Sequence, residues 1–200
     1  MPHSAAPRLF LIRHGETAWT LTGQHTGLTD IPLTPAGEAK ASAIGERLGS
    51  LRDGNGSFAR VFTSPLIRAR RTCDLAGFGD VAAVDADLVE WNYGQYDGLT
   101  SAQINRDRPD WDLFRDGAPG GETPEQAAAR ADRFLQRVLT IDADVAAFSS
   151  GHFIRLLAAR WLGLPIVAAK HFYTATASIG ILGYEHGRED RVVRLWNQTQ

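Results

Sequence analysis

Short apolar runs alternate with helix-like segments along this chain, and that alternation constrains the fold more than any other feature of the sequence. Residues 8–12 (Arg-Leu-Phe-Leu-Ile) are typical of a buried strand that ends at a polar cluster. Residues 60–63 and 144–148 repeat this pattern, and residues 177–184 and 191–196 predict two later strands. Helical spacing of apolar residues occupies the intervals between the earlier strands. The sequence therefore predicts an α/β fold, a three-layer sandwich with a mostly parallel central sheet and helices on both faces.

Capping residues mark where several predicted helices begin. Thr34-Pro35 and Ser64-Pro65 each place a capping side chain before a proline at the first helical position. Residues 123–126 form a capping box. Apolar residues at helical spacing extend the first of these helices to Leu51. Residues 80–120 are rich in Gly, Asp and Trp and lack periodicity, so we expect a lid-like excursion around 91–121.

Composition limits the classes of protein to which the chain can belong. Its 200 residues are 44% hydrophobic, which fits a single domain spanning residues 1–200. A formal net charge of −2 gives no basic field for nucleic acid or a membrane surface, and no apolar run reaches the roughly 20 residues of a spanning helix. The single cysteine, Cys73, lies at helical spacing among apolar residues, which indicates a packed thiol. Because residues 1–7 lack a signal-peptide core, we expect a cytoplasmic protein. Nothing in the sequence indicates an oligomeric state.

Polar residues follow three of the predicted strands. His14 follows the first, Ser64 and Arg68 follow the second, and His152 follows the third. The carboxyl ends of parallel strands meet at one edge of a sheet, where the sites of α/β folds form. Taken singly, a strand-end histidine is more often structural than catalytic, and Arg68 is typical of a solvated helix residue. Their convergence is what predicts a polar crevice.

These residue types suit a phosphoryl group, which carries about one to two negative charges near pH 7. Arg13 and Arg68 offer guanidinium donors, and the helix starts near Arg68 and His152 offer backbone N–H groups. Neighbouring arginines disfavour protonation of a histidine, so His14 is expected to keep the lone pair that a nucleophile needs. His25 lies in a glycine-flanked loop and is either a ligand contact or an incidental residue.

Five motifs, in order, resemble those of the histidine phosphatase superfamily in its phosphoglycerate mutase-like branch. They occupy residues 11–17 (Leu-Ile-Arg-His-Gly-Glu-Thr), 23–34, 64–69 (Ser-Pro-Leu-Ile-Arg-Ala), 90–98 (Glu-Trp-Asn-Tyr-Gly-Gln-Tyr-Asp-Gly) and 151–165. The resemblance implies the corresponding α/β fold and a metal-independent phosphatase without a cofactor. Its substrate would be a small phosphorylated metabolite.

The resemblance also implies a role for each matching residue. His14 would attack phosphorus and become a phosphohistidine. Arg13, Arg68 and His152 would hold the phosphoryl oxygens, and Glu90 would protonate the leaving group and then take a proton from water. Further substrate contacts are expected at Gly15, Thr20, Thr26, Gly27, Tyr93, Arg115, Gly151 and Phe153.

Two details of the pattern bear on the substrate. Thr20 stands where mutases of this family commonly have an asparagine, and its hydroxyl can donate one hydrogen bond. Residues 91–100 and 111–122 look similar to the sugar-bisphosphatase branch that includes sedoheptulose bisphosphatase. On that interpretation Arg115, beside aromatic residues, would bind a second phosphate. Arg106 and Arg108 are either further contacts or ordinary surface residues.

Two alternative functions stay open at this point. A cofactor-dependent phosphoglycerate mutase would share the motifs, but the chain is short for that group and residues 101–121 contain no lysine. A non-catalytic module that binds a phospho-ligand would also share them. Such relatives usually lose the nucleophile or the acid, whereas His14 and Glu90 are both present. The sequence therefore favours a phosphatase.

Overall fold

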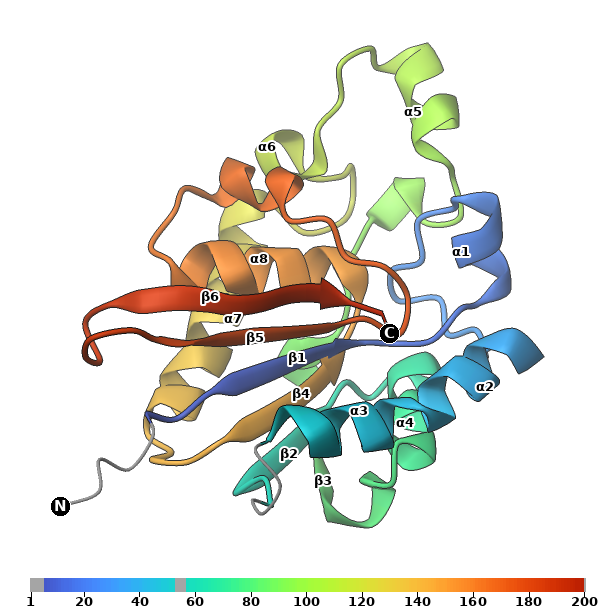
Figure 1. Cartoon of the computed structure of the whole chain (residues 1–200). Coiled ribbons are helices and arrows are strands. Elements are labelled where there is room, and N and C mark those ends of the chain that lie inside the picture. The colour runs from blue at the N-terminus through green and yellow to red at the C-terminus, as the bar shows by residue number, and fades with distance from the viewer. Residues whose placement is uncertain (1–5, 53–56, 200) are drawn as a thin grey trace, which may run out of the picture.

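The computed structural model describes residues 6–52 and 57–199 (Figure 1). One six-stranded sheet organises this part of the chain, in the spatial order β3-β2-β4-β1-β5-β6. The strands are β1 (Leu9–Arg13), β2 (Arg60–Thr63), β3 (Ala82–Val84), β4 (Val145–Ser149), β5 (Ile179–Tyr184) and β6 (Arg191–Gln198). The first four strands pair in parallel, while β5 is antiparallel to β1 and β6 is antiparallel to β5. The predicted mostly parallel sheet is confirmed.

Helices cover both faces of the sheet, as Figure 1 shows. One layer contains α2 (Pro35–Ser42), α3 (Ile44–Leu51) and α4 (Ile67–Leu75), and the other contains α7 (Pro124–Leu139) and α8 (Gly151–Trp161). Alternating side chains of β1 divide the core between the two layers. Phe10 and Ile12 pack with residues of α3 and α4, whereas Leu9 and Leu11 pack with residues of α7 and α8.

The remaining helices are short. They are α1 (Ala18–Thr22), α5 (Ser101–Asp107), α6 (Leu113–Asp116) and the 3-10 helices η1 (Gly79–Val81), η2 (Ala86–Leu88), η3 (Gly94–Tyr96) and η4 (Ile166–His171). In Figure 1 the segment with α5 and α6 extends above the sheet, where the sequence predicted a lid-like excursion. The short strand β3 and the helix η4 were not predicted, because neither has a strong periodic pattern.

Two predicted helix starts have different outcomes. Thr34 caps α2 as expected, because its Oγ1 accepts a hydrogen bond from Gly37 N at 3.0 Å. Ser64 does not cap α4: Leu66 is the N-cap residue and its side chain makes no capping bond. The carboxylate of Asp30, from a distant loop, instead accepts the N–H of Ile67 at 2.8 Å. A tertiary contact thus replaces the local cap that the Ser-Pro pair predicted.

The single helix predicted to run to Leu51 is divided into α2 and α3 at Ala43. A close approach of Gly45 to the end of α4 accompanies this division. A Cβ on Gly45 would lie 2.5 Å from the carbonyl oxygen of Ala76, so only glycine allows this packing. The hydrophobic pattern of the sequence did not reveal this division, because Ile44 and Leu48 are both buried in the core and keep the helical spacing.

Candidate active site

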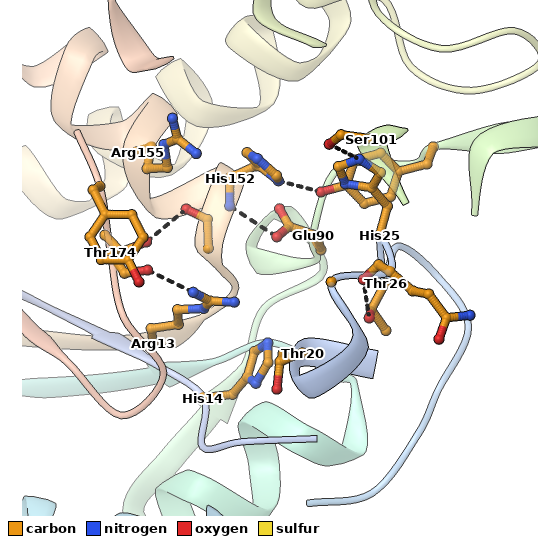
Figure 2. Close-up of a pocket in the computed structure, with 15 residues that line it drawn as sticks. Arg13, His14, Thr20, His25, Thr26, Glu90, Ser101, His152, Arg155 and Thr174 are labelled. Carbon is orange, nitrogen blue, oxygen red and sulfur yellow. Dashed lines mark hydrogen bonds between the residues drawn. The ribbon is translucent and has the colours of Figure 1, made fainter. Parts of the chain in front are cut away.

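A cavity of about 250 Å³ opens beyond the carboxyl ends of the central strands (Figure 2). Fifteen residues line it, and eight of them were predicted from the sequence as site residues: Arg13, His14, Thr20, Thr26, Glu90, Tyr93, Gly151 and His152. They come from segments that are far apart along the chain. The strand order brings these segments together, because β1 and β4 are neighbours in the sheet and β2 flanks β4.

His14 is buried directly after β1, with an exposed fraction of 2%. Its Nδ1 lies 2.7 Å from the carbonyl oxygen of Gly15, and because a carbonyl only accepts, Nδ1 must carry the proton. Burial, reinforced by the charges of Arg68 and Arg13, holds the pKa of His14 well below its usual value. The imidazole is therefore neutral near pH 7, with its lone pair on Nε2.

Arg13 lines the cavity beside His14. Its Nη1 donates to the carbonyl oxygen of Thr174 at 2.6 Å, and burial lowers the pKa of the guanidinium from its usual value. No acidic side chain in the described ranges forms an ion pair with Arg13. Its guanidinium also packs against Gly151, where an added Cβ would lie 3.0 Å from Nε of Arg13. Because Gly151 has no side chain, there is room for the guanidinium of Arg13 beside it.

Arg68 is fully buried in the first turn of α4 and does not line the cavity. Its two terminal nitrogens donate to the carbonyl oxygens of Thr26, Gly27 and Thr29, at 2.7–3.0 Å. Nε of Arg68 has no hydrogen-bond partner in the described structure. Arg68 lowers the pKa of His14 through its charge. Its positive charge is therefore fixed close to the nucleophile candidate.

Residues 26–30 form the loop that holds Arg68. Asp97 accepts hydrogen bonds from Gly27 N at 2.8 Å and from both the N–H and the hydroxyl of Thr29. Asp30 caps α4 at Ile67, so the loop is fixed at both ends. We name these residues the 26–30 loop.

Glu90 is buried in the cavity wall, and three backbone N–H groups hold its carboxylate. Oε1 accepts from Trp91 N at 2.9 Å and from Phe153 N at 2.8 Å, whereas Oε2 accepts only from His152 N at 2.9 Å. Both lone pairs of Oε1 are thus used, and Oε2 keeps one for a proton. Phe153 contributes through its backbone, since its side chain is fully buried in the core.

His152 and Tyr93 are joined by a hydrogen bond of 2.5 Å between the tyrosine hydroxyl and Nδ1. Burial raises the pKa of Tyr93 well above its usual value, so the hydroxyl keeps its proton and donates. Burial also holds the pKa of His152 well below its usual value, with Arg155 contributing. His152 is therefore neutral, accepts at Nδ1 and carries its proton on Nε2. In Figure 2 His152 lies on the opposite side of Glu90 from His14.

His25 also lines the cavity, its ring centroid 4.9 Å from that of Tyr93. Nε2 lies 3.2 Å from the hydroxyl oxygen of Ser101. Burial lowers the pKa of His25 to about 4. The three histidines of the cavity are thus all neutral near pH 7.

Several predicted contacts do not lie in the cavity wall. Gly15 and Gly27 permit close packing: an added Cβ would lie 2.6 Å from the carbonyl oxygen of Gly37 and 2.8 Å from that of Trp91, respectively. The hydroxyl of Thr20 does reach the wall, but it donates to the carbonyl oxygen of Thr17 at 2.8 Å within a capping box.

Arg115 was predicted to contact substrate but lies outside the cavity. Its guanidinium forms an ion pair with the adjacent Asp116 at 2.7 Å and also donates to the carbonyl oxygen of Asp110. The carboxylate of Asp116 therefore binds the Arg115 side chain, which was expected from the sequence to bind a second phosphate.

Sequence analysis missed other residues of the cavity wall. Arg155 follows His152 by three residues on α8, and helical spacing could have found it because such pairs share a face. Tyr173 and Thr174 come from the irregular segment between η4 and β5, which carries no local signal. Among the described residues, no group of three or more His, Cys, Asp or Glu side chains is arranged to hold a metal ion. In the same part of the chain, no helix is both long and apolar enough to span a membrane.

Fold and site together define an α/β protein with a cationic cavity built around a buried, neutral histidine. The chain belongs to the histidine phosphatase superfamily (branch 1), whose family model matches residues 9–199. An acid phosphatase of Mycobacterium tuberculosis is 43% identical over 196 residues, covering 96% of this chain and 95% of that protein. Sedoheptulose 1,7-bisphosphatase of Saccharomyces cerevisiae is 36% identical over 193 residues, covering 82% and 70%. The solved structure of a Mycobacterium tuberculosis open reading frame matches with a TM-score of 0.89 and 40% identity, covering 96% of this chain and 97% of that one. Family and relatives support a phosphoric monoester hydrolase.

Proposed function

We propose that this chain is a metal-independent phosphatase that hydrolyses monoesters of small phosphorylated metabolites through a phosphohistidine on His14. The observation that carries the proposal is the protonation state of His14. Its Nδ1 is occupied by the carbonyl oxygen of Gly15, and its pKa is held well below the usual value, so Nε2 is free to attack. The acid phosphatase and the sugar bisphosphatase among its relatives are consistent with this reaction.

In the first step, Nε2 of His14 forms a bond to phosphorus while the bond from phosphorus to the ester oxygen breaks. Glu90 gives a proton from Oε2 to the leaving oxygen, because Oε1 is occupied by two backbone N–H groups. Arg13 and the Nε2–H of His152 donate to the phosphoryl oxygens. Arg68 stabilises the developing negative charge from its buried position.

In the second step, the oxygen of a water molecule bonds to phosphorus and the bond between phosphorus and Nε2 breaks. Glu90 takes the proton from that water, so one carboxyl group serves as acid and then as base. Phosphate leaves, and His14 returns to its neutral state. Arginine charges supply the electrostatic stabilisation that a cation gives in metal-dependent phosphoryl transfer.

The wider setting belongs to the same proposal. Residues 1–200 form one domain, supported by a single sheet with helices on both faces. A cytoplasmic location is supported by the lone cysteine, Cys73, a buried thiol whose pKa is raised to about 12. A formal charge of −2 argues against nucleic acid or a membrane surface as a partner. The yeast relative makes sugar bisphosphates the first substrates to examine.

The test uses p-nitrophenyl phosphate and the variant His14→Ala. We expect the wild type to turn over this ester, to form an acid-labile phosphoenzyme on rapid quenching, and to need no added metal. His14→Ala should form no phosphoenzyme, and His186→Ala, at an exposed position, should form the same amount as the wild type. Labelling of His14→Ala at the wild-type level would contradict the proposal.

The same assay separates the two alternative functions. A phospho-ligand binding module would bind vanadate without turning over any ester. A mutase would convert 3-phosphoglycerate into 2-phosphoglycerate in the presence of 2,3-bisphosphoglycerate, without release of phosphate. We expect phosphate release to exceed isomerisation.

A further inference from the structure

Arg155 is a cation in the cavity wall. The proposed hydrolysis of a simple monoester gives it no role. It lies on α8 with His152, and in Figure 2 its guanidinium lies on the side of the cavity away from His14. Arg13 lines the cavity beside His14, and Arg68 acts on His14 through its charge from a buried position. Arg155 therefore needs a separate explanation.

The guanidinium of Arg155 is held in a fixed orientation. Nε donates to the carbonyl oxygen of Ala169 at 3.1 Å, and Nη2 donates to that of Lys170 at 2.6 Å. Its plane lies over the ring of Phe114, with Cζ 5.1 Å from the ring centroid. Only Nη1 has no bond to a described residue. A side chain fixed by two carbonyls and a ring presents its remaining donors without further loss of conformational freedom.

Among the described residues no carboxylate forms an ion pair with Arg155, and Glu90 and Asp112 act on its charge only from a longer distance. Arg160, five residues along the same helix, shows the usual arrangement: it pairs with Asp132 at 2.8 Å. A partly buried cation without an ion-pair partner is stabilised when an anion binds beside it. Arg155 thus has the features of a ligand contact, and Arg160 does not.

The charges of the cavity lead to the same result. The three histidines are neutral, and Glu90 is the one acid among the fifteen lining residues. When Glu90 carries the proton for the leaving group, the residues that line the cavity carry no negative charge, and Arg13 and Arg155 are their two cations. Arg13 lies beside His14 and the transferred phosphoryl group, so Arg155, on the side of the cavity away from His14, is left for another part of the substrate.

We propose that Arg155 forms a second anion subsite, which selects phosphomonoesters whose leaving group carries its own phosphate or carboxylate. This inference rests on the proposed function, because it assigns the substrate class of the same cavity. It replaces Arg115, which is paired with Asp116 outside the cavity, as the residue that meets a second anion. Phosphate and carboxylate present the same oxygen geometry to a guanidinium fork, so both are tested.

The experiment compares four esters. Fructose 1,6-bisphosphate and 3-phosphoglycerate carry a second anion, whereas glycerol 3-phosphate and p-nitrophenyl phosphate do not. A charged hydrogen bond of this kind corresponds to a change in kcat/KM of about 10- to 100-fold. We expect Arg155→Gln to lower kcat/KM for the first two esters by that factor relative to the last two, mainly through KM. Whichever of the two falls further identifies phosphate or carboxylate as the preferred group.

Two further variants control for packing. Arg160→Gln removes an arginine from the same helix and should leave the ratio between the two ester classes at the wild-type value. Arg155→Lys keeps the charge and should restore part of the ratio. An equal loss on all four esters in Arg155→Gln would overturn the subsite, and so would a wild type that shows no preference for 3-phosphoglycerate over glycerol 3-phosphate. The comparison of the two esters in the wild type still tests the subsite if Arg155→Gln fails to fold.

Failure of the phosphatase proposal has a different signature. A wild type that hydrolyses none of the four esters contradicts the proposed function. In that case calorimetric titration of 3-phosphoglycerate and glycerol 3-phosphate into the wild type still tests the subsite. Tighter binding of 3-phosphoglycerate is expected, and equal binding would overturn it.

Discussion

Single side chains in the cavity owe their chemical state to backbone groups more than to other side chains. The carbonyl oxygen of Gly15 fixes the tautomer of His14, and three backbone N–H groups leave one lone pair on Oε2 of Glu90 for a proton. Backbone partners are held by the fold itself, so they do not depend on rotamer choice. In the proposed mechanism the reacting atoms are therefore oriented before any ligand arrives.

Replacing the carboxyl of Glu90 tests its role in proton transfer. Glu90→Gln cannot protonate a leaving group, so we expect kcat for an alkyl ester such as glycerol 3-phosphate to fall by about 10²- to 10⁴-fold. The loss for p-nitrophenyl phosphate should be much smaller, because p-nitrophenolate leaves without protonation. Steady-state kinetics on both esters measures the difference.

Glu38→Gln is the control for this substitution, since the carboxylate of Glu38 is exposed and pairs with Arg71 on the surface. It should leave both rates unchanged. A loss of equal size on both esters in Glu90→Gln would argue that Glu90 is structural and transfers no proton.

At the scale of elements, the 26–30 loop connects the start of α4 to the cavity. It holds Arg68 with three carbonyl oxygens and is itself held by Asp97 and by the bond from Ile67 N to Asp30. Loss of the Asp30 cap should therefore destabilise the first turn of α4 and also make the position of Arg68 less fixed.

Removal of this cap gives a prediction about stability. Asp30→Ala should lower the free energy of unfolding by about 1 kcal/mol, the usual effect of losing an N-cap acceptor. Asp30→Asn keeps an acceptor oxygen and should recover most of the lost free energy of unfolding. Urea denaturation measures both variants, with the exposed Asp107→Ala as control. If Asp30→Ala is as stable as the control, the bond to Ile67 contributes nothing.

Local patterns predicted most elements, and tertiary contacts explain the exceptions. Buried strands and the capping box at Thr123 are visible in sequence because apolar period and capping chemistry are local. The predicted cap of α4 at Ser64 was wrong because the carboxylate of Asp30, 37 residues before Ile67, accepts the N–H of Ile67 instead. Strand β3 was missed because it has three residues, two of them exposed, and is defined by its pairing with β2.

The site shows the same division between local and distant information. His14 and Glu90 stand in motifs, so their place in the cavity could be predicted. Arg115 lies outside the cavity wall and pairs with its neighbour Asp116, a contact that the nearby aromatic residues did not indicate. Arg155 could have been found by helical spacing from His152, whereas Tyr173 could not, because its segment has no regular structure.

At the scale of the whole molecule, three neutral histidines in the cavity wall make folding depend on pH. The folded-state pKa values of His14, His25 and His152 lie below the unfolded value near 6.5, and that of His25 is about 4. Below pH 6.5 the unfolded chain therefore binds more protons than the folded one. By linkage, stability falls as the pH falls through this range, and it is complete above it.

This linkage predicts a measurable slope. Each histidine that stays neutral should cost about 1.4 kcal/mol of unfolding free energy per pH unit between pH 6.5 and its folded pKa. Urea denaturation at pH 5 and pH 7 should show the difference. His25→Gln should reduce the slope, while His186→Gln, at an exposed position, should not. A stability that is equal at the two pH values would contradict burial of these rings in the neutral form.

Gly151 shows how one position can separate selection for folding from selection for activity. It does not adopt a left-handed backbone conformation, so an alanine there would meet no backbone strain. The added methyl would press only on the end of Arg13, a flexible side chain that can move away. A library screened for expression would therefore retain Gly151→Ala, whereas a screen for turnover would discard it. The two screens together would show whether the position is constrained by the fold or by the activity.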